Sequence, residues 1–255
     1  MDMIERKPWT RDELILAINL YCKTSFGKIH VRNPDIIELA INLGRTPGSV
    51  SYKLANFASI DPSLDRKGAS NVSKLDKEVW AEFFDNWDDM AYQSEAQMAK
   101  LNKKSLKDLD SFTEEDVFEE GKSRESIVKV RIKQEFFRKM ILSAYDNTCC
   151  ITGISISELL IASHIVPWST DTKNRLNPRN GLCLNALHDR AFDKGLISIS
   201  GDLRIVVSPL IYQQESKQHD LEFITDYVNK EIRLPSRFLP DHNLLEYHRQ
   251  NIFRG

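Results

Sequence analysis

The stretch IASHIVPWS, residues 161–169, places His164 within an apolar run that is typical of a β-strand. A single histidine in such a strand is more often a hydrogen-bonded core residue than a catalytic one. Here it is followed by a polar loop that ends at Asn180, a second short strand (GLCL), and a helical segment (NALHDRAFD) that contains His188. The ordered set of strand histidine, loop asparagine and helix histidine therefore indicates a functional site.

This order of residues resembles the ββα-metal motif of HNH endonucleases. The resemblance covers about residues 148–200 and is carried by the segments CCITG, ASHIVPW, NPRNGLCL and LHDRAFDKGLISI. The flanking segments QEFFRKMILSAYDNTCC and LLEYHRQNIF are similar to those of an HNH subgroup found in bacterial restriction-type proteins. The resemblance implies an α+β fold that is mostly helical, and a restriction-type DNA endonuclease activity.

The resemblance also implies a role for each member of the set. His164 would be the general base, because a neutral imidazole can accept a proton from water near neutral pH. Asn180 would tie the loop back and orient that histidine, since an amide donates and accepts hydrogen bonds at once. His188 would hold one divalent ion against the scissile phosphate, with Mg²⁺ or Mn²⁺ favoured and Zn²⁺ or Ni²⁺ as further options.

The chain departs from the family at the residue before the general base. Many HNH enzymes have an aspartate there that supplies the second metal ligand, whereas this chain has Ser163, which is neutral and a weak ligand. We expect a metal shell of His188, Ser163 and Asp193, although Asp189, a backbone carbonyl or extra waters could compensate instead. Asp193 could equally cap the end of its helix or brace the following loop.

Many relatives also bind a structural zinc through two Cys-x-x-Cys pairs. The matching positions here are Cys150, Gly153, Leu184 and Leu187, so one thiol of four remains. The sequence therefore predicts no structural zinc, and it predicts that the two leucines bury apolar surface in its place.

Residues 1–90 are predicted to form a helical domain. The segments PWTRDELILAI and LGRTPGSVSYKLANF are similar to a Myb/SANT-type tri-helical unit, and Thr10, Asn33 and Thr46 stand where helix caps are favoured. The resemblance implies a helix-turn-helix, although such units also serve as protein–protein modules. The exposed groups that we expect to contact DNA lie on the third helix and the turn before it: Arg45, Ser49, Tyr52, Lys53 and Asn56.

The polar loop STDTKNRLNPRN provides a second set of candidate DNA contacts. It carries Lys173, Arg175 and Arg179 against a single acid, Asp171. Beside a metal site these cations could clamp a phosphate, but charged loop residues are usually only solvated. The sequence leaves both interpretations open.

The charge distribution separates the parts of the chain. The net charge is −2, but residues 81–120 hold twelve acids and four bases. We therefore expect a helix-turn-helix-like domain (1–90), an acidic helical linker (91–122) and an HNH domain (123–255). The sequence shows no secretory signal and no apolar run long enough to span a membrane. Two of the four cysteines are adjacent, which disfavours a disulfide framework, so a reduced, cytoplasmic protein is expected.

These features predict a metal-dependent endonuclease that acts on double-stranded DNA. Because one ββα unit cuts one strand, cleavage of a duplex favours a homodimer. A cognate DNA methyltransferase acting on the same site would be the partner of a restriction enzyme. The alternatives are a DNA-binding regulator whose HNH fold is inactive, a modification-dependent enzyme, and a defence nuclease that degrades DNA non-specifically.

Overall fold

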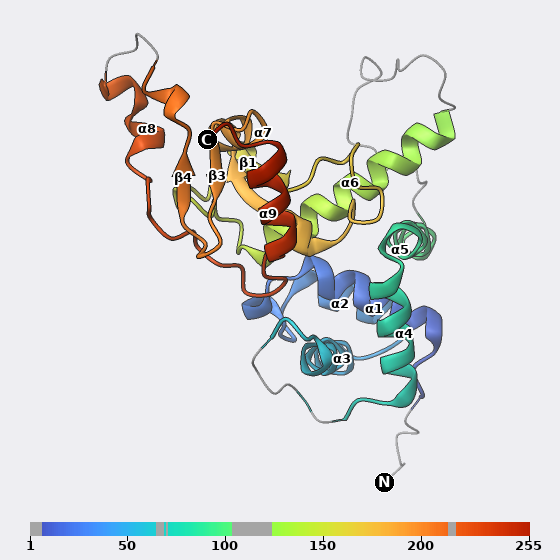
Figure 1. Cartoon of the computed structure of the whole chain (residues 1–255). Helices are drawn as coiled ribbons and strands as arrows, with labels where there is room; N and C mark the ends of the chain where they lie inside the picture. Colours follow the sequence, from blue (N-terminus) through green and yellow to red (C-terminus); the bar gives the residue numbers. More distant parts are fainter. Residues whose placement is uncertain (1–6, 65–68, 70, 104–123, 214–217) are drawn as a thin grey trace. The chain divides into compact units, whose positions relative to one another are not determined.

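The computed structural model describes residues 7–64, 69, 71–103, 124–213 and 218–255 (Figure 1). The chain divides into two compact units, Met1–Phe136 and Phe137–Gly255, and α6 (Arg124–Ala144) spans the boundary between them. The acidic segment 108–120, and with it most of the predicted linker, lies outside the described residues.

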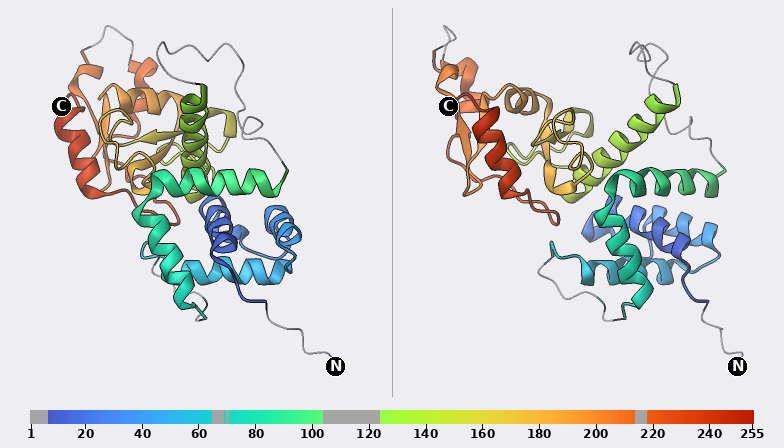
Figure 2. Two further views of the ribbon diagram at one scale, coloured as in Figure 1. Left: turned by 90° about the vertical axis from the view of Figure 1, so that its right-hand side faces the viewer. Right: turned by 45° about the vertical axis from the view of Figure 1, so that its right-hand side comes forward.

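The amino-terminal unit is built around α1 (Arg11–Lys23). The other elements before α6 are η1 (Phe26–Lys28), α2 (Pro34–Leu43), α3 (Pro47–Ile60), α4 (Lys74–Asp85) and α5 (Trp87–Leu101). Figure 2 shows α2, α3, α4 and α5 arranged around α1, and each of the four contacts it. Every α1 residue from Glu13 to Cys22 is therefore buried.

The first three helices begin where the sequence predicts. Thr10 forms a capping box with Glu13, and the Asn33 and Thr46 side chains each accept a hydrogen bond from the first turn of their helix. Helix α2 ends at Gly44, whose φ of 61° lies in the left-handed region that glycine adopts without strain. Local capping chemistry thus fixes these boundaries.

Helix α5 extends the first unit beyond its predicted end. Residue 90 falls inside this helix, which packs against α1 and α4 and buries Trp87, Met90 and Ala91. Residues 91–101 therefore belong to the amino-terminal unit and not to a linker, because they complete its apolar core.

The carboxy-terminal unit follows from Phe137. Its elements after α6 are η4 (Ser157–Leu159), β1 (Leu160–His164), η5 (Pro178–Asn180), β2 (Gly181–Asn185), α7 (Ala186–Asp193), β3 (Ile197–Ile199), β4 (Ile205–Val207), η6 (Pro209–Ile211), η7 (Gln218–Leu221), α8 (Glu222–Thr225) and α9 (His242–Asn251). The predicted α+β class is confirmed.

An antiparallel β1–β2 hairpin lies at the centre of this unit. His164 pairs with Gly181, and Leu160 pairs with Asn185. Helix α7 begins directly after β2 and packs against both strands, while β3 and β4 form a second hairpin that contacts α9. A Cβ at Gly181 would lie 2.3 Å from the Ile141 side chain of α6, so this close approach requires glycine.

The two leucines at the former zinc positions differ. Leu184 is buried in β2, as predicted, but Leu187 is 46% exposed, so its predicted burial is wrong. In this short helix the core side is occupied by His188, Ala191 and Phe192, and Leu187 does not share it. No helix in the described ranges is long and apolar enough to span a bilayer.

Candidate active site

His164 ends β1, and the following loop fixes its ring. The His164 Nε2 lies 2.9 Å from the backbone oxygen of Arg175. A carbonyl oxygen only accepts hydrogen bonds, so Nε2 carries the proton in this contact. In the neutral ring the lone pair is therefore on Nδ1, which is the atom that could accept a proton from water.

Two aromatic rings enclose the His164 imidazole. Phe137 of α6 stacks on it, with ring centroids 4.0 Å apart and 9° between the planes, and Trp168 meets it edge-on at 5.5 Å. Burial lowers the pKa of His164, and the hydrogen bond to the Arg175 carbonyl opposes that shift only in part. The ring is therefore neutral at pH 7, which is the state that accepts a proton.

Asn180 is fully buried and closes the loop between the two strands. Its Oδ1 accepts a hydrogen bond from the Val166 N–H at 2.8 Å, and its Nδ2 donates to the carbonyls of Val166 and Asn174, both at 3.1 Å. Its backbone oxygen accepts from the Ile165 N–H at 2.9 Å. Three of these four bonds hold the backbone directly after His164, and the fourth binds the loop at Asn174.

His188 lies in the first turn of α7 and is 2% exposed. The Oδ1 of Asn185, the helix N-cap, accepts hydrogen bonds from the backbone of Leu187 and His188 and lies 3.0 Å from the His188 Nδ1. Because Oδ1 accepts, Nδ1 carries the proton and the lone pair is on Nε2. Nε2 has no partner in normal hydrogen-bond geometry, and the Tyr227 ring meets the imidazole edge-on at 5.6 Å. Burial lowers the pKa of His188, although the Phe223 carbonyl acts in the opposite direction.

Ser163 of β1 lies beside Asp189 of α7. The Ser163 hydroxyl is 3% exposed and forms no hydrogen bond of normal geometry, yet it is close enough to lower the pKa of Asp189. Burial outweighs this effect and raises the Asp189 pKa. Asp193, one turn further along α7, is more exposed, and its pKa is raised by partial burial and by the charge of Asp189. The two aspartates thus form an acidic pair beside a buried hydroxyl.

The two histidine rings have separate surroundings. His164 packs between Phe137 and Trp168, whereas His188 contacts Asn185 and Tyr227. In the part of the chain that the structure describes, no hydrogen bond or ring contact joins one imidazole to the other. That both rings act on one phosphate stays a prediction.

The surroundings of Ser163 fit a divalent cation. Two carboxylates four residues apart on a helix and a buried hydroxyl are oxygen donors, which Mg²⁺ and Mn²⁺ prefer. No group of three or more His, Cys, Asp or Glu side chains among the described residues is arranged to hold a metal by itself. An ion here would complete its shell with water or phosphate oxygens, as Mg²⁺ commonly does.

The segment that contains the candidate site is similar to a known protein family. Residues 149–200 match a family model described as HNH endonuclease. The matched range includes β1, β2 and α7, and with them His164, Asn180 and His188. The carboxy-terminal unit contains an HNH endonuclease domain.

One solved structure, described as "Modification dependent TagI restriction endonuclease", is similar to part of the chain. The sequence identity is 21% and the TM-score is 0.33, and the match covers 46% of this chain and 37% of that protein. No curated protein sequence matches the chain.

The three cations of the loop 169–180 differ in how far other contacts already occupy their side chains. Arg175 donates from Nε to the Trp168 carbonyl at 2.7 Å and lies over the Trp168 ring at 5.3 Å. Arg179 pairs with Asp241 at 3.1 Å. Lys173 is exposed, and only its backbone N–H is bound in the turn, by Asp171 at 3.0 Å. Lys173 is therefore the loop cation best placed to meet a polyanion.

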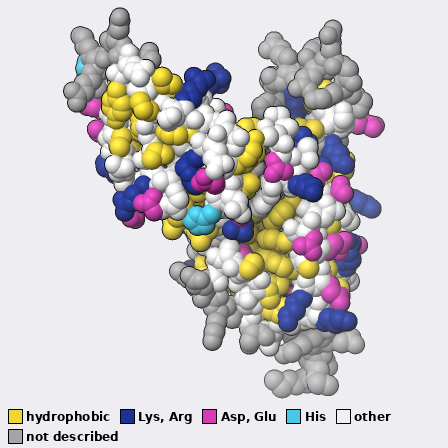
Figure 3. All heavy atoms as spheres, viewed as in Figure 1, with side chains coloured by type: hydrophobic (Ala, Val, Ile, Leu, Met, Phe, Trp, Pro, Cys, Tyr) yellow, Lys and Arg dark blue, Asp and Glu magenta, His cyan; other side chains and the backbone are white. Residues whose placement is uncertain are grey.

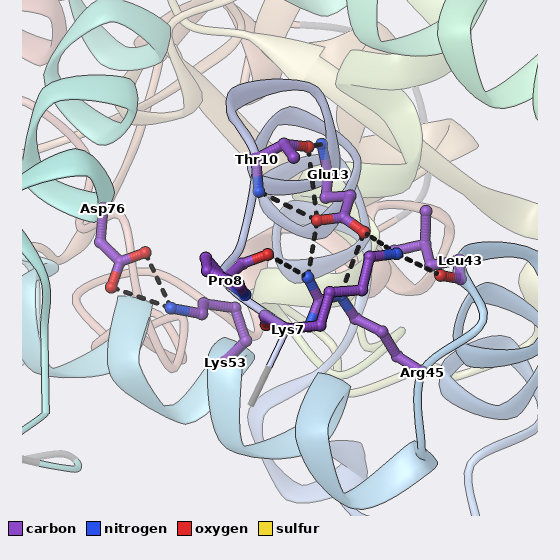
Figure 4. A network of polar contacts seen from close by, with 8 residues as sticks. All are labelled: Lys7, Pro8, Thr10, Glu13, Leu43, Arg45, Lys53 and Asp76. Atoms are coloured by element: carbon purple, nitrogen blue, oxygen red, sulfur yellow. Dashed lines mark hydrogen bonds and ion pairs between the residues drawn. The ribbon is translucent and has the colours of Figure 1, made fainter. Parts of the chain in front are cut away.

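The sequence predicts an exposed Arg45, but its side chain is buried and binds groups of the same amino-terminal unit (Figure 4). Its guanidinium donates to the two Glu13 carboxylate oxygens at 3.2 and 2.7 Å and to the carbonyls of Lys7 and Pro8. It also lies over the Trp9 ring at 4.1 Å. Burial alone would raise the pKa of Glu13, but hydrogen bonds, chiefly from Arg45, lower it to about 2.

Lys53 and Asn56 are buried as well. Lys53 is 7% exposed and binds both carboxylate oxygens of Asp76 at 2.8 and 2.9 Å, and Asn56 donates to the Asn71 carbonyl at 3.1 Å. Lys53 and Asn56 lie on α3, and their partners belong to α4 and to the residues before it. A unit of three helices would lack these partners. The prediction that Arg45, Lys53 and Asn56 form an exposed face is therefore wrong.

Tyr52 and Ser49 keep some access to solvent. Tyr52 is 48% exposed, and its hydroxyl accepts a hydrogen bond from Asn71 at 3.1 Å. Ser49 is half-buried, and its backbone N–H donates to the capping Thr46. On the face shown in Figure 3, Lys and Arg side chains are interspersed with Asp and Glu, so charge there does not single out a DNA-binding surface. DNA contact by this unit stays a prediction.

Three residues around the site were not found from the sequence. Asn185 had a local signal, because it stands directly before a helix in a position where caps are favoured. Phe137 and Tyr227 had none, since they lie far from His164 and His188 along the chain and only folding brings them together.

Proposed function

We propose that this chain is a metal-dependent DNA endonuclease of restriction type, in which His164 is the general base. The observation that supports the proposal is the hydrogen bond from the His164 Nε2 to the Arg175 carbonyl. It leaves Nδ1 as the acceptor of a neutral ring, on the strand of a ββα unit that matches the HNH endonuclease family.

The chemistry of the proposal is hydrolysis of a phosphodiester. His164 Nδ1 takes a proton from a water molecule while the water oxygen bonds to phosphorus and the bond to the 3′ oxygen breaks. Asn180 and the Arg175 carbonyl keep the imidazole in position for this transfer. A bound Mg²⁺ or Mn²⁺ would stabilise negative charge on the phosphate and the leaving oxygen. The side chains that would hold it, Ser163, His188, Asp189 and Asp193, lie on β1 and α7.

The substrate of the proposal is double-stranded DNA. A separate helical unit in the same chain as the HNH domain supports directed cleavage. Its remaining accessible candidates for DNA contact are Tyr52 and Ser49, and that of the loop 169–180 is Lys173. One ββα unit cuts one strand, so we propose a homodimer for duplex cleavage. A DNA methyltransferase acting on the same site belongs to the same proposal.

Plasmid cleavage tests the proposal. Supercoiled plasmid, either unmodified, methylated or hydroxymethylated, is incubated with Mg²⁺ or Mn²⁺ and wild type, His164→Ala or the exposed control His242→Ala. We expect wild type and H242A to cut, and H164A to be slower by about 10²–10⁴-fold, the usual contribution of a general base. The cleavage rate should also rise with pH through a value below 6.5, because burial lowers the pKa of His164.

The outcomes separate the alternatives. A wild type that cuts none of these plasmids with either metal would favour a DNA-binding regulator with an inactive HNH fold. Cutting of modified DNA alone would indicate a modification-dependent enzyme, and a continuous smear of fragments from every plasmid would indicate a non-specific nuclease.

A further inference from the structure

We infer that Phe137 of α6 is a positioning residue for the general base, because its ring lies flat on the His164 imidazole and fixes the plane of that ring. The inference rests on the proposed function, since it concerns the base of that reaction. It adds a residue from outside the segment 149–200, which is the part of the chain that matches the HNH endonuclease family. Phe137 is 1% exposed, so its role is indirect and passes through His164.

A single hydrogen bond does not fix the plane of the His164 ring. The bond from Nε2 to the Arg175 carbonyl holds one atom of the imidazole, but the χ2 torsion of histidine has a broad range, so the ring could still tilt about that atom. Phe137 removes this freedom, because the two rings are 4.0 Å apart with 9° between their planes, whereas Trp168 meets the imidazole only edge-on. The lone pair on Nδ1 therefore keeps one direction, as proton transfer from a water aligned with a phosphate requires.

The residue opposite His164 in the hairpin leaves room for this stack. Gly181 pairs with His164 across the two strands. Its φ of −129° is available to any residue, so the backbone conformation does not require glycine there. A Cβ at this position would lie 2.9 Å from the Phe137 Cζ and 2.3 Å from the Ile141 Cδ1. The lack of a side chain therefore lets α6 bring the Phe137 ring onto the imidazole.

The next residue of α6 aligns the helix with β1. Arg138 donates from Nη1 to the Leu160 carbonyl at 2.7 Å, at the start of that strand, and Phe137 contacts His164 at its end. Two consecutive residues of α6 thus bind both ends of β1. These contacts restrain where the Phe137 ring lies relative to the imidazole.

A second stack in the same unit shows the arrangement that serves the fold alone. Phe192 stacks on His248 with ring centroids 3.7 Å apart and 14° between the planes. Both nitrogens of His248 are bound, Nδ1 by the Ser198 hydroxyl at 2.8 Å and Nε2 by the Phe192 carbonyl at 3.1 Å. At His164 the described residues bind Nε2 alone, so the stack there orients a nitrogen that keeps its lone pair. His248 is therefore an internal control for His164.

Nuclear magnetic resonance of the full chain tests the inference without DNA or metal. Isotope-labelled histidine reports the Nε2–H groups of His164 and His248, which both donate to carbonyls, and their exchange with water is measured at neutral pH. Phe137→Leu keeps most of the apolar volume but loses the flat ring. The His164 Nε2–H should then exchange about 2- to 10-fold faster, which is the factor that an aromatic pair contributes. The His248 Nε2–H should exchange as in wild type.

Steady-state plasmid cleavage with Mn²⁺ is the second measurement. F137L should lower kcat by about tenfold and leave KM almost unchanged, because it displaces the base and touches no substrate. Phe136→Leu is the matched control: Phe136 is the preceding residue of α6, is also 1% exposed and packs against Phe83 of the amino-terminal unit. It should lower the melting temperature to a similar extent but keep the kcat of wild type.

Gly181→Ala is a second variant that leaves the Phe137 side chain in the protein. The new Cβ would meet the Phe137 and Ile141 side chains below van der Waals distance, so the stack on His164 has to shift. G181A should therefore lower kcat and speed exchange of the His164 Nε2–H in the same direction as F137L.

Three results would overturn the inference: wild-type exchange of the His164 Nε2–H in F137L, an equal rise in exchange at His248, or a loss of kcat in F136L as large as in F137L. If F137L does not fold, the same criteria apply to G181A. A wild type that cuts no DNA, but in which F137L speeds exchange at His164 alone, would support the role of Phe137 and reject the nuclease. Cleavage by a wild type whose exchange and kcat are unaffected by F137L would do the reverse.

Discussion

The amino-terminal unit holds a buried polar pair, Lys53 and Asp76, between α3 and α4. The carboxy-terminal unit holds a second polar pair between β1 and α7, in which Ser163 is buried and Asp189 is half-buried. In the first pair the ammonium binds both carboxylate oxygens, so every charge has its counterpart. In the second pair the hydroxyl has no hydrogen bond of normal geometry and the carboxylate has a raised pKa. A complete pair serves the fold, whereas an incomplete one leaves donor and acceptor capacity that a ligand can use. The role of a polar side chain that stands out in a sequence therefore depends on whether the fold already supplies its hydrogen-bond or charge partner.

The largest stability effect is expected where the complete pair is broken. Lys53→Met leaves the Asp76 carboxylate buried without its counter-charge and should lower the free energy of unfolding by about 3–5 kcal/mol. Urea denaturation followed by tryptophan fluorescence measures the change. Lys74→Met, which breaks only the exposed pair with Glu78, is the control and should cost about 0.5 kcal/mol or less. Equal effects of the two variants would show that burial does not distinguish these pairs.

The buried side chain of His248, whose hydrogen-bond partners are in place, predicts a loss of stability in acid. His248 is bound to Ser198 at 2.8 Å and stacks on Phe192, and burial, with a smaller effect of Arg249, lowers its pKa to about 4. Because the unfolded chain binds this proton near pH 6.5, stability is full above that pH and falls as the pH approaches 4, by up to about 3 kcal/mol.

Denaturation curves between pH 7.5 and pH 4 check this expectation. The His248→Gln variant should show a shallower dependence on pH than wild type over that window, and the exposed His242→Gln variant should follow wild type. Parallel pH profiles for wild type and H248Q would mean that His248 is not buried in its neutral form.

The Asn180 side chain forms three hydrogen bonds, in contrast to the Ser163 hydroxyl, which forms none of normal geometry. Asn180→Ala removes three side-chain hydrogen bonds and leaves the Val166 N–H and two carbonyls without them, so it should destabilise the protein by about 1–3 kcal/mol. It should also slow plasmid cleavage, because the backbone after His164 loses its restraint. A variant with normal stability and slow cleavage would instead indicate a direct role of the amide in the reaction.

The smallest stability effect is expected at Ser163. Its hydroxyl has no normal hydrogen bond to lose, so Ser163→Ala should change the free energy of unfolding by about 0.5 kcal/mol or less. The same urea experiment measures it, beside Lys53→Met. A loss of 2 kcal/mol or more, the order seen when a satisfied buried group is removed, would show that the hydroxyl has a partner and that this pair is complete too.

Sequence alone determined the features that depend on neighbours within a few residues. Thr10, Asn33 and Thr46 cap their helices because each side chain reaches a backbone N–H only two or three positions away. The order of strand, loop, strand and helix around His164 and Asn180 was also predictable, since alternation, turn residues and a family resemblance all lie in one short segment. The α+β class followed from these local elements.

Only the tertiary structure decided which polar groups are already satisfied. Lys53 looks like a surface cation until α4 brings Asp76 against it, and only the fold places the His188 ring against Asn185 and Tyr227. Phe137 meets His164 through packing of α6 on the hairpin, which no local pattern specifies. Burial and pairing are properties of several segments at once, so residues that read alike in the sequence became a structural ion pair in one unit and a candidate catalytic site in the other.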